Sequence, residues 1–183
     1  MSIMRIIGII GKRRTGKDTV ADYVTTHYGF EKKKFAAPMK AAMEVLFGFS
    51  KDQLETDLKD EIDDRWGVSP RTLMQSMGTQ FLQYELQKII PELGHNYAVK
   101  RLFIQDDLPD KIIISDVRFI HEVDEIKKRG GLLIKLIRDN NKNNNIDAHI
   151  SEKGVDELPF DQSIENNASL KDLYQKIDQI LSE

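Results

Sequence analysis

The chain has 183 residues, of which 40% are hydrophobic and 31% charged, with a net charge of −3 and no cysteine. This composition predicts one globular domain with a substantial core. It argues against bulk nucleic-acid or anionic-membrane binding, and it excludes disulfides and cysteine nucleophiles. No apolar run is long enough to span a bilayer, and the start of the chain is too short for a signal peptide, so we expect a cytoplasmic protein.

Short apolar runs alternate along the chain with amphipathic segments. In chain order we predict a strand at 3–10, a helix at 18–28, a strand at 34–37, a helix at 38–47, a long helix from 70 to Pro91, a helix at 98–103 capped by Asn96, a strand at 111–116, a helix at 119–129, and strands at 132–137 and 163–166 before a last helix at 169–181. This alternation predicts an α/β sheet with helices on both faces.

Two segments do not fit this pattern. Residues 51–67 are rich in charge and have few apolar anchors, so we predict an exposed helical or mobile flap. Residues 139–152 contain a run of asparagines, which predicts a flexible, lid-like loop. Both lie within the single domain that we predict over 1–183.

The segment between the first strand and the first helix reads Gly11-Lys-Arg-Arg-Thr-Gly-Lys-Asp-Thr19. It has the spacing of the phosphate-binding pattern G-x-x-x-x-G-K-[ST], in the strand-to-helix context that this pattern needs. A plain turn would explain the glycines, but not the crowding of basic residues at a helix N-terminus, where the helix dipole disfavours cations. We therefore expect Gly11, Arg14, Gly16 and Lys17 to bind the phosphates of a nucleotide.

Position 18 departs from the pattern, because Asp18 stands where a serine or threonine would bind magnesium, and Thr19 comes one residue late. A carboxylate beside a triphosphate must either bind the metal indirectly or turn away. We expect Asp18 and Thr19 to hold Mg²⁺ through water.

A polar cluster follows the apolar run at 111–115. Asp116 ends the predicted strand, Arg118 follows it, and Glu122 lies on the next helix. Ligands of open α/β sheets bind at the carboxyl edge, where the Asp116 carboxylate would bind a metal through water, orient a phosphate or accept a ribose hydroxyl. The alternative role of Asp116 is to cap the following helix.

Further basic residues stand at the starts of elements, with Lys40 just after Pro38 and Arg71 just after Pro70. Phosphoryl transfer needs such cations, because they neutralise two anionic reactants. Each alone is more simply interpreted as a surface charge than as a ligand, whereas together they are equally compatible with a pocket for an acceptor phosphate. Trp66 could stack on a base or lie in the core.

The phosphate loop is followed, in order, by four further motifs: Ala37-Pro-Met-Lys40, Arg71-Thr-Leu-Met-Gln-Ser-Met-Gly-Thr79, Asp116-Val-Arg-Phe-Ile-His-Glu122 and Asp147-Ala-His-Ile-Ser-Glu152. In this combination the chain resembles the deoxynucleoside monophosphate kinases of T-even bacteriophages and large DNA viruses. The Gly-Lys-Asp-Thr ending of the loop looks like a trait of that family. The chain looks shorter than the phage enzymes between Gly48 and Trp66, where they carry an insertion.

The resemblance implies a three-layer α/β/α P-loop NTPase fold with a mostly parallel sheet and a helical lid or acceptor region. It implies transfer of the γ-phosphate of ATP, with Mg²⁺, to a nucleoside monophosphate. Asp18, Thr19 and Val20 would join Gly16 and Lys17 in holding the donor. The residues implied for the acceptor are Arg13, Met39, Lys40, Arg71, Asp116, Arg118 and Glu122, and those implied for catalysis are Lys17, Arg13, Arg118 and Asp116.

Two other functions remain open at this point. The same fold could phosphorylate another small phosphorylated acceptor, such as phosphomevalonate or dephospho-coenzyme A, and a nucleotide-dependent switch would bind without transfer. We expect a small-molecule nucleotide partner, no stable nucleic-acid binding and no membrane. The apolar helix around Leu82–Leu86 leaves room for a homodimer face, and a viral origin would place the protein in the host cytoplasm.

Overall fold

The computed structural model of the chain describes residues 4–139 and 154–182. It divides into a sheet unit, Met1–Lys34 with Asp106–Glu183, and a helical unit, Phe35–Gln105. The lid-like loop beyond Asp139 and the motif Asp147–Glu152 lie outside the described residues, and the prediction of a single domain with a flap at 51–67 stays a prediction.

The sheet unit contains a five-stranded sheet in the order β2-β3-β1-β4-β5, and every neighbouring pair of these strands is parallel. The strands are β1 (Arg5–Ile10), β2 (Glu31–Lys33), β3 (Lys111–Val117), β4 (Leu132–Ile137) and β5 (Gln162–Glu165). The first strand lies at the centre, with its two sequence-distant partners β3 and β4 on either side. The predicted α/β fold with a parallel sheet is confirmed.

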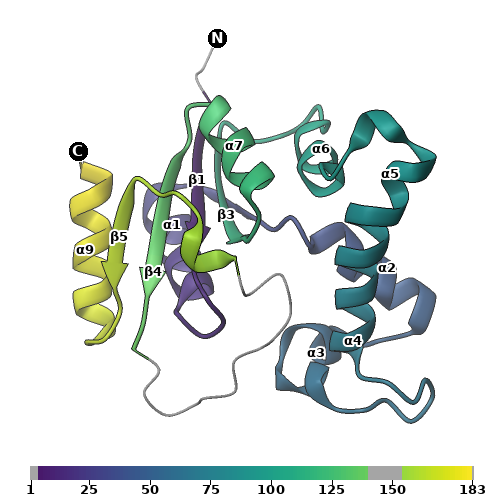
Figure 1. The fold of residues 1–183 in the computed structure, drawn as a ribbon. Coiled ribbons are helices and arrows are strands. Elements are labelled where there is room, and N and C mark those ends of the chain that lie inside the picture. Colours follow the sequence, from purple (N-terminus) through teal and green to yellow (C-terminus); the bar gives the residue numbers. More distant parts are fainter. Residues whose placement is uncertain (1–3, 140–153, 183) are drawn as a thin grey trace. The chain divides into compact units, whose positions relative to one another are not determined.

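Helices cover both faces of this sheet. They are α1 (Lys17–Tyr28), α7 (Ile120–Lys128) and α9 (Leu170–Ser182). Alternation along β1 directs Ile7 and Ile9 into a core shared with α1 and α9. On the other face Gly8 leaves room for Ile126 of α7, whose Cδ1 would lie only 2.9 Å from a Cβ at position 8. Figure 1 shows α7 in front of the sheet and α1 behind it.

The short second strand begins earlier than the sequence predicts. Strand β2 covers Glu31–Lys33 and pairs with β3, whereas the prediction put it at 34–37. The chain turns back to the sheet at once after α1, because Gly29 adopts a left-handed conformation with φ 70°. Residues 34–37 have already left the sheet, since α2 begins at Ala37 with Pro38 in its first turn.

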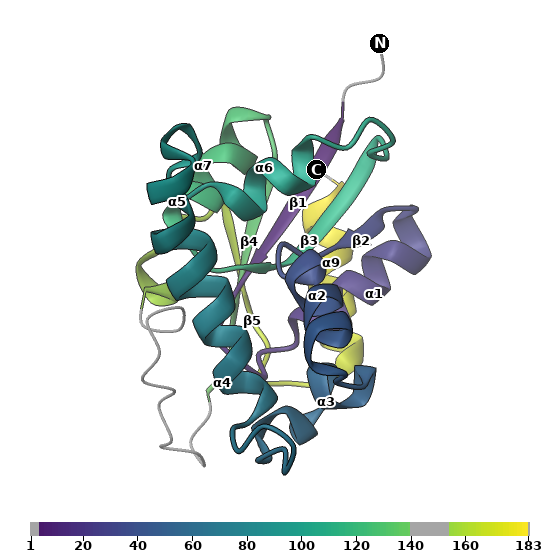
Figure 2. The same ribbon diagram turned by 90° about the vertical axis from the view of Figure 1, so that its right-hand side faces the viewer.

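The helical unit consists of short helices around one longer helical rod. The α-helices are α2 (Ala37–Phe47), α3 (Lys51–Glu55), α4 (Pro70–Gln75), α5 (Leu86–Ile89) and α6 (Tyr97–Phe103). Figure 2 shows the rod running from α4 into α5. Between them the rod is a π-helix, Ser76–Glu85. None of the helices in the described parts of the chain is both long enough and apolar enough to cross a membrane.

This π-helix changes which side chains of the rod are buried. The Leu86 N–H donates to the carbonyl of Phe81, five residues earlier rather than four, so the helix turns less per residue. The helical spacing of 3.6 predicts Phe81 on the buried stripe, yet Phe81 is 41% exposed. Thr79 and Gln83 are buried in its place.

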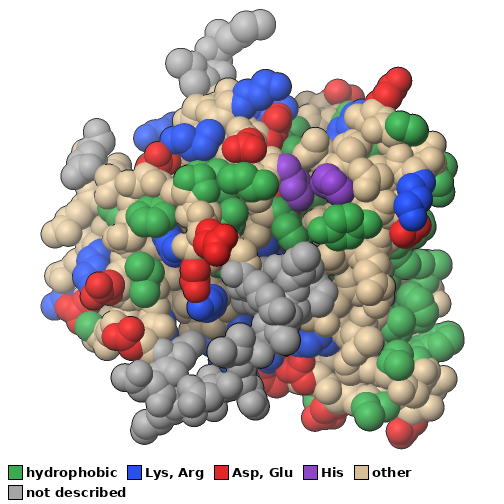
Figure 3. Space-filling view, viewed as in Figure 1, with side chains coloured by type: hydrophobic (Ala, Val, Ile, Leu, Met, Phe, Trp, Pro, Cys, Tyr) green, Lys and Arg blue, Asp and Glu red, His purple; other side chains and the backbone are tan. Residues whose placement is uncertain are grey.

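The second helix buries a narrower stripe than its helical spacing predicts, which comprises Met39, Ala42, Met43, Leu46 and Phe47. Met43 is fully buried with Phe49 and Leu54, and Met39 packs against this cluster. Leu46, predicted on the same stripe, is 61% exposed and Val45 is 84% exposed. Figure 3 shows hydrophobic side chains gathered over α2 at the right-hand edge of the view.

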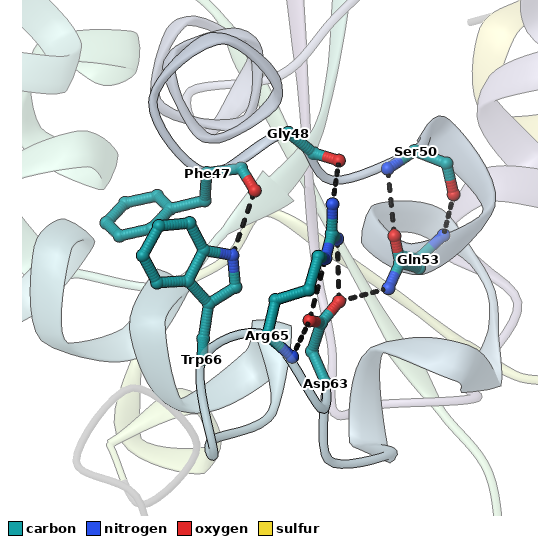
Figure 4. Close-up of polar contacts among 7 residues, drawn as sticks. All are labelled: Phe47, Gly48, Ser50, Gln53, Asp63, Arg65 and Trp66. Atoms are coloured by element: carbon teal, nitrogen blue, oxygen red, sulfur yellow. Dashed lines mark hydrogen bonds and ion pairs between the residues drawn. The ribbon is translucent and has the colours of Figure 1, made fainter.

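A polar clamp holds the segment that follows α3. Asp63 accepts hydrogen bonds from Arg65 Nε and Nη2 at 2.9 and 2.7 Å, and Arg65 Nη1 donates to the Gly48 carbonyl at 3.1 Å. The Trp66 Nε1–H donates to the Phe47 carbonyl, and the two rings pack edge to face (Figure 4). Both contacts tie residues 63–66 to the end of α2. The indole of Trp66 therefore has a structural partner within its own unit.

Candidate active site

The phosphate loop joins β1 to α1 at the carboxyl edge of the sheet. Because β1 has β3 on one side and β4 on the other, this loop stands where the strand order reverses, which is the ligand-binding position of such sheets. Gly16 has φ 100° and ends the loop, and the first helical hydrogen bond runs from Val20 N–H to its carbonyl. The Val20 side chain is fully buried in the core, so only its backbone faces the loop.

The loop is closely packed against the neighbouring strands β4 and β5. A Cβ at Gly11 would lie 2.8 Å from the Leu136 carbonyl, so only glycine fits there. Thr15 is buried, and its hydroxyl donates to the Lys12 carbonyl at 2.9 Å. Asn166, which follows β5, donates from Nδ2 to the Thr15 carbonyl at 2.9 Å. Asn166 is the last residue of the strand predicted at 163–166, and no sequence signal indicates its contact with the loop.

Lys17 is held inside the curve of the loop. Its Nζ donates to the carbonyls of Gly11 and Lys12 at 2.7 and 2.6 Å. Burial, followed by the positive charge of Arg118, lowers the pKa of Lys17 to about 8. Asp18 and Asp116 act in the opposite direction on the same ammonium group. The structure therefore brings four predicted site residues close together: Lys17, Asp18, Asp116 and Arg118.

Asp18 lies in the first turn of α1 and contacts side chains from two strands. Its Oδ1 pairs with Lys32 Nζ at 2.7 Å and Lys34 Nζ at 3.1 Å, and accepts from Ser115 Oγ at 3.3 Å. Burial alone would raise the pKa of Asp18, but the hydrogen bond and charge of Lys32 and Lys34 lower it to about 2. Asp18 is ionised at neutral pH, and neither lysine is among the site residues that the sequence predicts.

Asp116 and Arg118 are half-buried at the carboxyl end of β3, which extends to Val117. Asp116 does not cap the next helix, because α7 begins at Ile120. Glu122 stabilises the turn before α7 instead, because its Oε2 accepts hydrogen bonds from the N–H groups of Arg118 and Phe119 at 2.7 and 3.1 Å. Burial raises the pKa of Glu122 to about 8. These contacts favour a role for Glu122 in positioning Arg118.

The other predicted cations belong to the helical unit, where acidic residues pair with them. Lys40 Nζ lies 2.8 Å from Glu55 Oε2 of α3. Arg71, in the first turn of α4, contacts the Asp60 carboxylate with its Nε and Nη2. Met39 lies against the hydrophobic cluster of this unit. In the sheet unit Arg13 is half-buried in the loop, Thr19 is half-buried in the first turn of α1, and Arg14 is exposed with φ 64°.

A magnesium ion fits the chemistry of this loop. No cluster of three or more metal-ligating side chains occurs among the residues that the structure describes. Magnesium, however, keeps several waters and takes most other ligands from phosphates, so one or two carboxylates suffice. Asp18 and Asp116 are carboxylates close enough to Lys17 to act on its charge.

These observations define a P-loop protein of the α/β class. The family model for "Deoxynucleotide monophosphate kinase" matches residues 5–61 and 44–177. A protein of Acanthamoeba polyphaga mimivirus, provisionally named a deoxynucleotide monophosphate kinase, is 36% identical over 95% of this chain and 94% of its own length. The deoxynucleotide monophosphate kinase of Enterobacteria phage T4 is 26% identical over 95% of this chain and 97% of its own. The chain belongs to the deoxynucleotide monophosphate kinase family, and it is a phosphotransferase.

The fold also matches a solved structure. The protein TT1252 from Thermus thermophilus has a TM-score of 0.50 and 15% identity, over 98% of this chain and 97% of that one. At this identity the likeness concerns the fold alone. The two stretches matched by the family model overlap at 44–61, which shares residues with the region between Gly48 and Trp66 where the chain looks shorter than the phage enzymes.

Proposed function

We propose that this enzyme transfers the γ-phosphate of ATP to deoxynucleoside 5′-monophosphates, giving the diphosphates and ADP. The observation that carries this proposal is the position of the half-buried Lys17 in the phosphate loop, next to Arg118 and Asp116 at the end of β3. The activity for which the family and the phage T4 relative are named supports this choice of acceptor.

In this reaction an oxygen of the acceptor phosphate forms a bond to the γ-phosphorus. The bond from that phosphorus to the β–γ bridging oxygen breaks, and ADP leaves with the electron pair. Lys17 and the N–H groups of the loop stabilise the charge on the donor phosphates. No side chain has to remove a proton, because the acceptor phosphate is ionised at neutral pH.

Cations are needed where the two anionic reactants meet. Arg118 and Arg13 are proposed to bind the acceptor phosphate, since arginine makes bidentate contacts with phosphate. Glu122 fixes the backbone at Arg118, and Asp116 orients the acceptor. From the helical unit we propose Met39, Lys40 and Arg71 as acceptor ligands. For Lys40 and Arg71 this requires the ion pairs with Glu55 and Asp60 to open or share the charge.

Magnesium supplies charge neutralisation on the β- and γ-phosphates when it is bound. Asp18 and Thr19 are proposed to hold it through water. All three contacts of Asp18 described above involve Oδ1. A water-mediated contact through Oδ2 is compatible with them. Because the relatives are viral proteins, we place the enzyme in the cytoplasm of an infected cell.

The test is ADP release from ATP and magnesium across all the common ribo- and deoxynucleoside monophosphates, with phosphomevalonate and dephospho-coenzyme A alongside. We expect strong stimulation by one or more deoxynucleotides and its loss in Lys17→Ala. Stimulation by a non-nucleotide alone would retain the P-loop mechanism and refute the acceptor. ATP binding without stimulation by any acceptor would favour the nucleotide switch.

A further inference from the structure

Three consecutive lysines lie at the end of the edge strand β2. Lys32 and Lys33 belong to the strand, and Lys34 follows it directly. Lys32 and Lys34 both contact Oδ1 of Asp18, at 2.7 and 3.1 Å. Lys33, between them, pairs instead with Glu31 of its own strand. This alternation follows from the strand, because successive side chains point to opposite faces. Lys32 and Lys34 therefore share the face that meets α1.

The strand register places Lys34 at the ligand-binding edge. Lys33 lies opposite Ile114 of β3, so Lys34 is level with Ser115. The Ser115 hydroxyl donates to the same Oδ1 of Asp18 as the two lysines do. Asp18 directly follows Lys17, and the charge of Lys34 is among those that lower the pKa of Lys17. Lys34 thus stands beside the phosphate loop.

The exposure of the paired groups shows which partner is held in place. The Asp18 side chain is 60% exposed, whereas those of Lys32 and Lys34 are each 24% exposed. An exposed carboxylate does not need two lysines in order to be satisfied. The two lysines are largely covered, and both contact the same oxygen of this exposed carboxylate. These contacts therefore fix the positions of the two ammonium groups near Asp18.

The charges explain how an acidic residue is tolerated at this position. A carboxylate in the first turn of α1 would repel a polyphosphate at the same helix N-terminus. Lys32 and Lys34, both on its Oδ1, offset the negative charge of the Asp18 carboxylate. Lys32 is also paired with Asp22 at 2.8 Å, whereas Lys34 lies closer to the carboxyl edge of the sheet.

We propose that Lys34 is a further phosphate-binding residue of the loop, and that Asp18 is the positioning residue that holds its ammonium group there. The ligand is the polyphosphate chain of a nucleotide, so the assignment rests on the proposed function for the identity of that ligand. In this arrangement Asp18 replaces the hydroxyl residue of the common pattern. Its carboxylate holds a second lysine, Lys34, beside Lys17 at the phosphates.

The first experiment measures the Kd of inorganic tripolyphosphate and of ATP by calorimetry at about pH 7 in EDTA, without metal. Lys34→Ala should raise both Kd values about tenfold, as loss of a charge-assisted hydrogen bond does. Lys34→Arg should recover part of the affinity. Lys33→Ala, the matched control on the opposite face, should stay within about twofold of the wild type.

The second experiment is a double-mutant cycle. Asp18→Asn should weaken binding in the wild-type background but have less than about a twofold effect in the Lys34→Ala background. Unchanged binding in Lys34→Ala would overturn the assignment of Lys34. An equal effect of Asp18→Asn in both backgrounds, or tighter binding in either, would overturn the positioning role.

Two controls keep these outcomes interpretable. Thermal unfolding and circular dichroism are followed for each variant, and Lys34→Gln replaces Lys34→Ala if the latter does not fold. Lys17→Ala must abolish tripolyphosphate binding, since the loop is the site being probed. A silent acceptor panel together with Lys34-dependent tripolyphosphate binding would refute the proposed function and leave this inference standing.

Discussion

At the scale of single residues, the buried ammonium group of Lys17 links the fold to the charge of its ligand. Two carbonyls of its own loop accept its hydrogen bonds, and burial lowers its pKa to about 8. A bound polyphosphate favours the charged form and raises this pKa again. Ligand binding and protonation of Lys17 are therefore coupled.

This coupling predicts a pH-dependent affinity. The Kd of ATP should rise as the pH passes about 8, approaching tenfold per pH unit, because the neutral amine cannot pair with phosphate. Lys17→Arg should bind more weakly but with a flat profile over the same range, since arginine stays charged. Calorimetric titrations between about pH 6.5 and 9.5 measure both curves, and parallel curves for the two proteins would contradict the assignment.

Glu122 gives a second prediction, on stability. Its folded pKa of about 8 lies above the ordinary glutamate value of 4.5, so its contribution to stability is complete below pH 4.5 and is lost as the pH rises through 8. Glu122→Gln keeps an acceptor for the N–H groups of Arg118 and Phe119 but does not titrate. Its unfolding free energy relative to the wild type should therefore increase with pH, by at most about 1.4 kcal/mol per unit.

Urea unfolding at several pH values between about 5 and 8.5 measures this trend. Glu125→Gln, on the same helix and paired with Arg129, is the matched loss of a carboxylate. The same trend in both variants would show that overall charge, not the buried Glu122, is responsible. If Glu122 positions Arg118, Glu122→Gln should also retain most of the activity.

At the scale of elements, the clamp at residues 63–66 orders a segment that composition marks as exposed and charged. Asp63 is almost fully buried, and the hydrogen bonds of Arg65 hold the pKa of that carboxyl well below its usual range. Arg65 in turn reaches the carbonyl of Gly48, at the end of α2. The clamp therefore links α2, which carries Lys40, to the segment that leads into Arg71 and α4.

Removing the charge of Asp63 should loosen this segment. Asp63→Asn should lower the Tm by several degrees and expose residues 56–68 to limited proteolysis, since the Arg65 guanidinium loses its carboxylate. Because the pKa of Asp63 is depressed, this difference should be present at neutral pH and shrink as the pH falls below about 4. Asp64→Asn, at the exposed neighbouring position, should leave both measurements unchanged.

The sequence predicted elements best where a local pattern and the tertiary structure agree. The phosphate loop is recognised by a motif, and the end of α1 after it is marked by Gly29. The structure has the helix where this pattern predicts it. The rod is different, because hydrogen bonding over five residues cannot be recognised from the spacing of apolar residues. Phe81 is exposed for that reason.

Site residues follow a similar division. Lys17 and Asp116 are marked by a motif and by the end of an apolar run, so their neighbourhood could be predicted. Asn166 and Lys34 are brought to the loop by strand pairing across the sheet, and nothing near them in the sequence signals it. The role of Glu122 required the geometry of the turn, because a carboxylate at that spacing also suits a ligand contact.

At the scale of the whole molecule, a homodimer stays a prediction. The apolar helix that suggested it exposes Tyr84 by 41% and Ile89 by 71%. Exposed apolar side chains grouped in this way are typical of an interaction face. We expect a dimer in analytical ultracentrifugation that Ile89→Glu converts to a monomer.

Val45→Glu on α2 is the control, because Val45 is 84% exposed on a different helix. Dissociation by Val45→Glu but not by Ile89→Glu would move the interface to α2. A wild-type monomer at all protein concentrations would contradict the prediction.

The order of the strands has a consequence for how the chain is made. Strand β1 is complete at Ile10, but its partners begin only at Lys111 and Leu132. At about 5–20 residues per second, the ribosome needs about 5–20 s to synthesise the residues between β1 and β3. During that time the helical unit, which is continuous in sequence, can fold. The apolar strand β1, in contrast, has no strand with which to pair. The central strand of the sheet is therefore the segment of the nascent chain that most needs protection from aggregation.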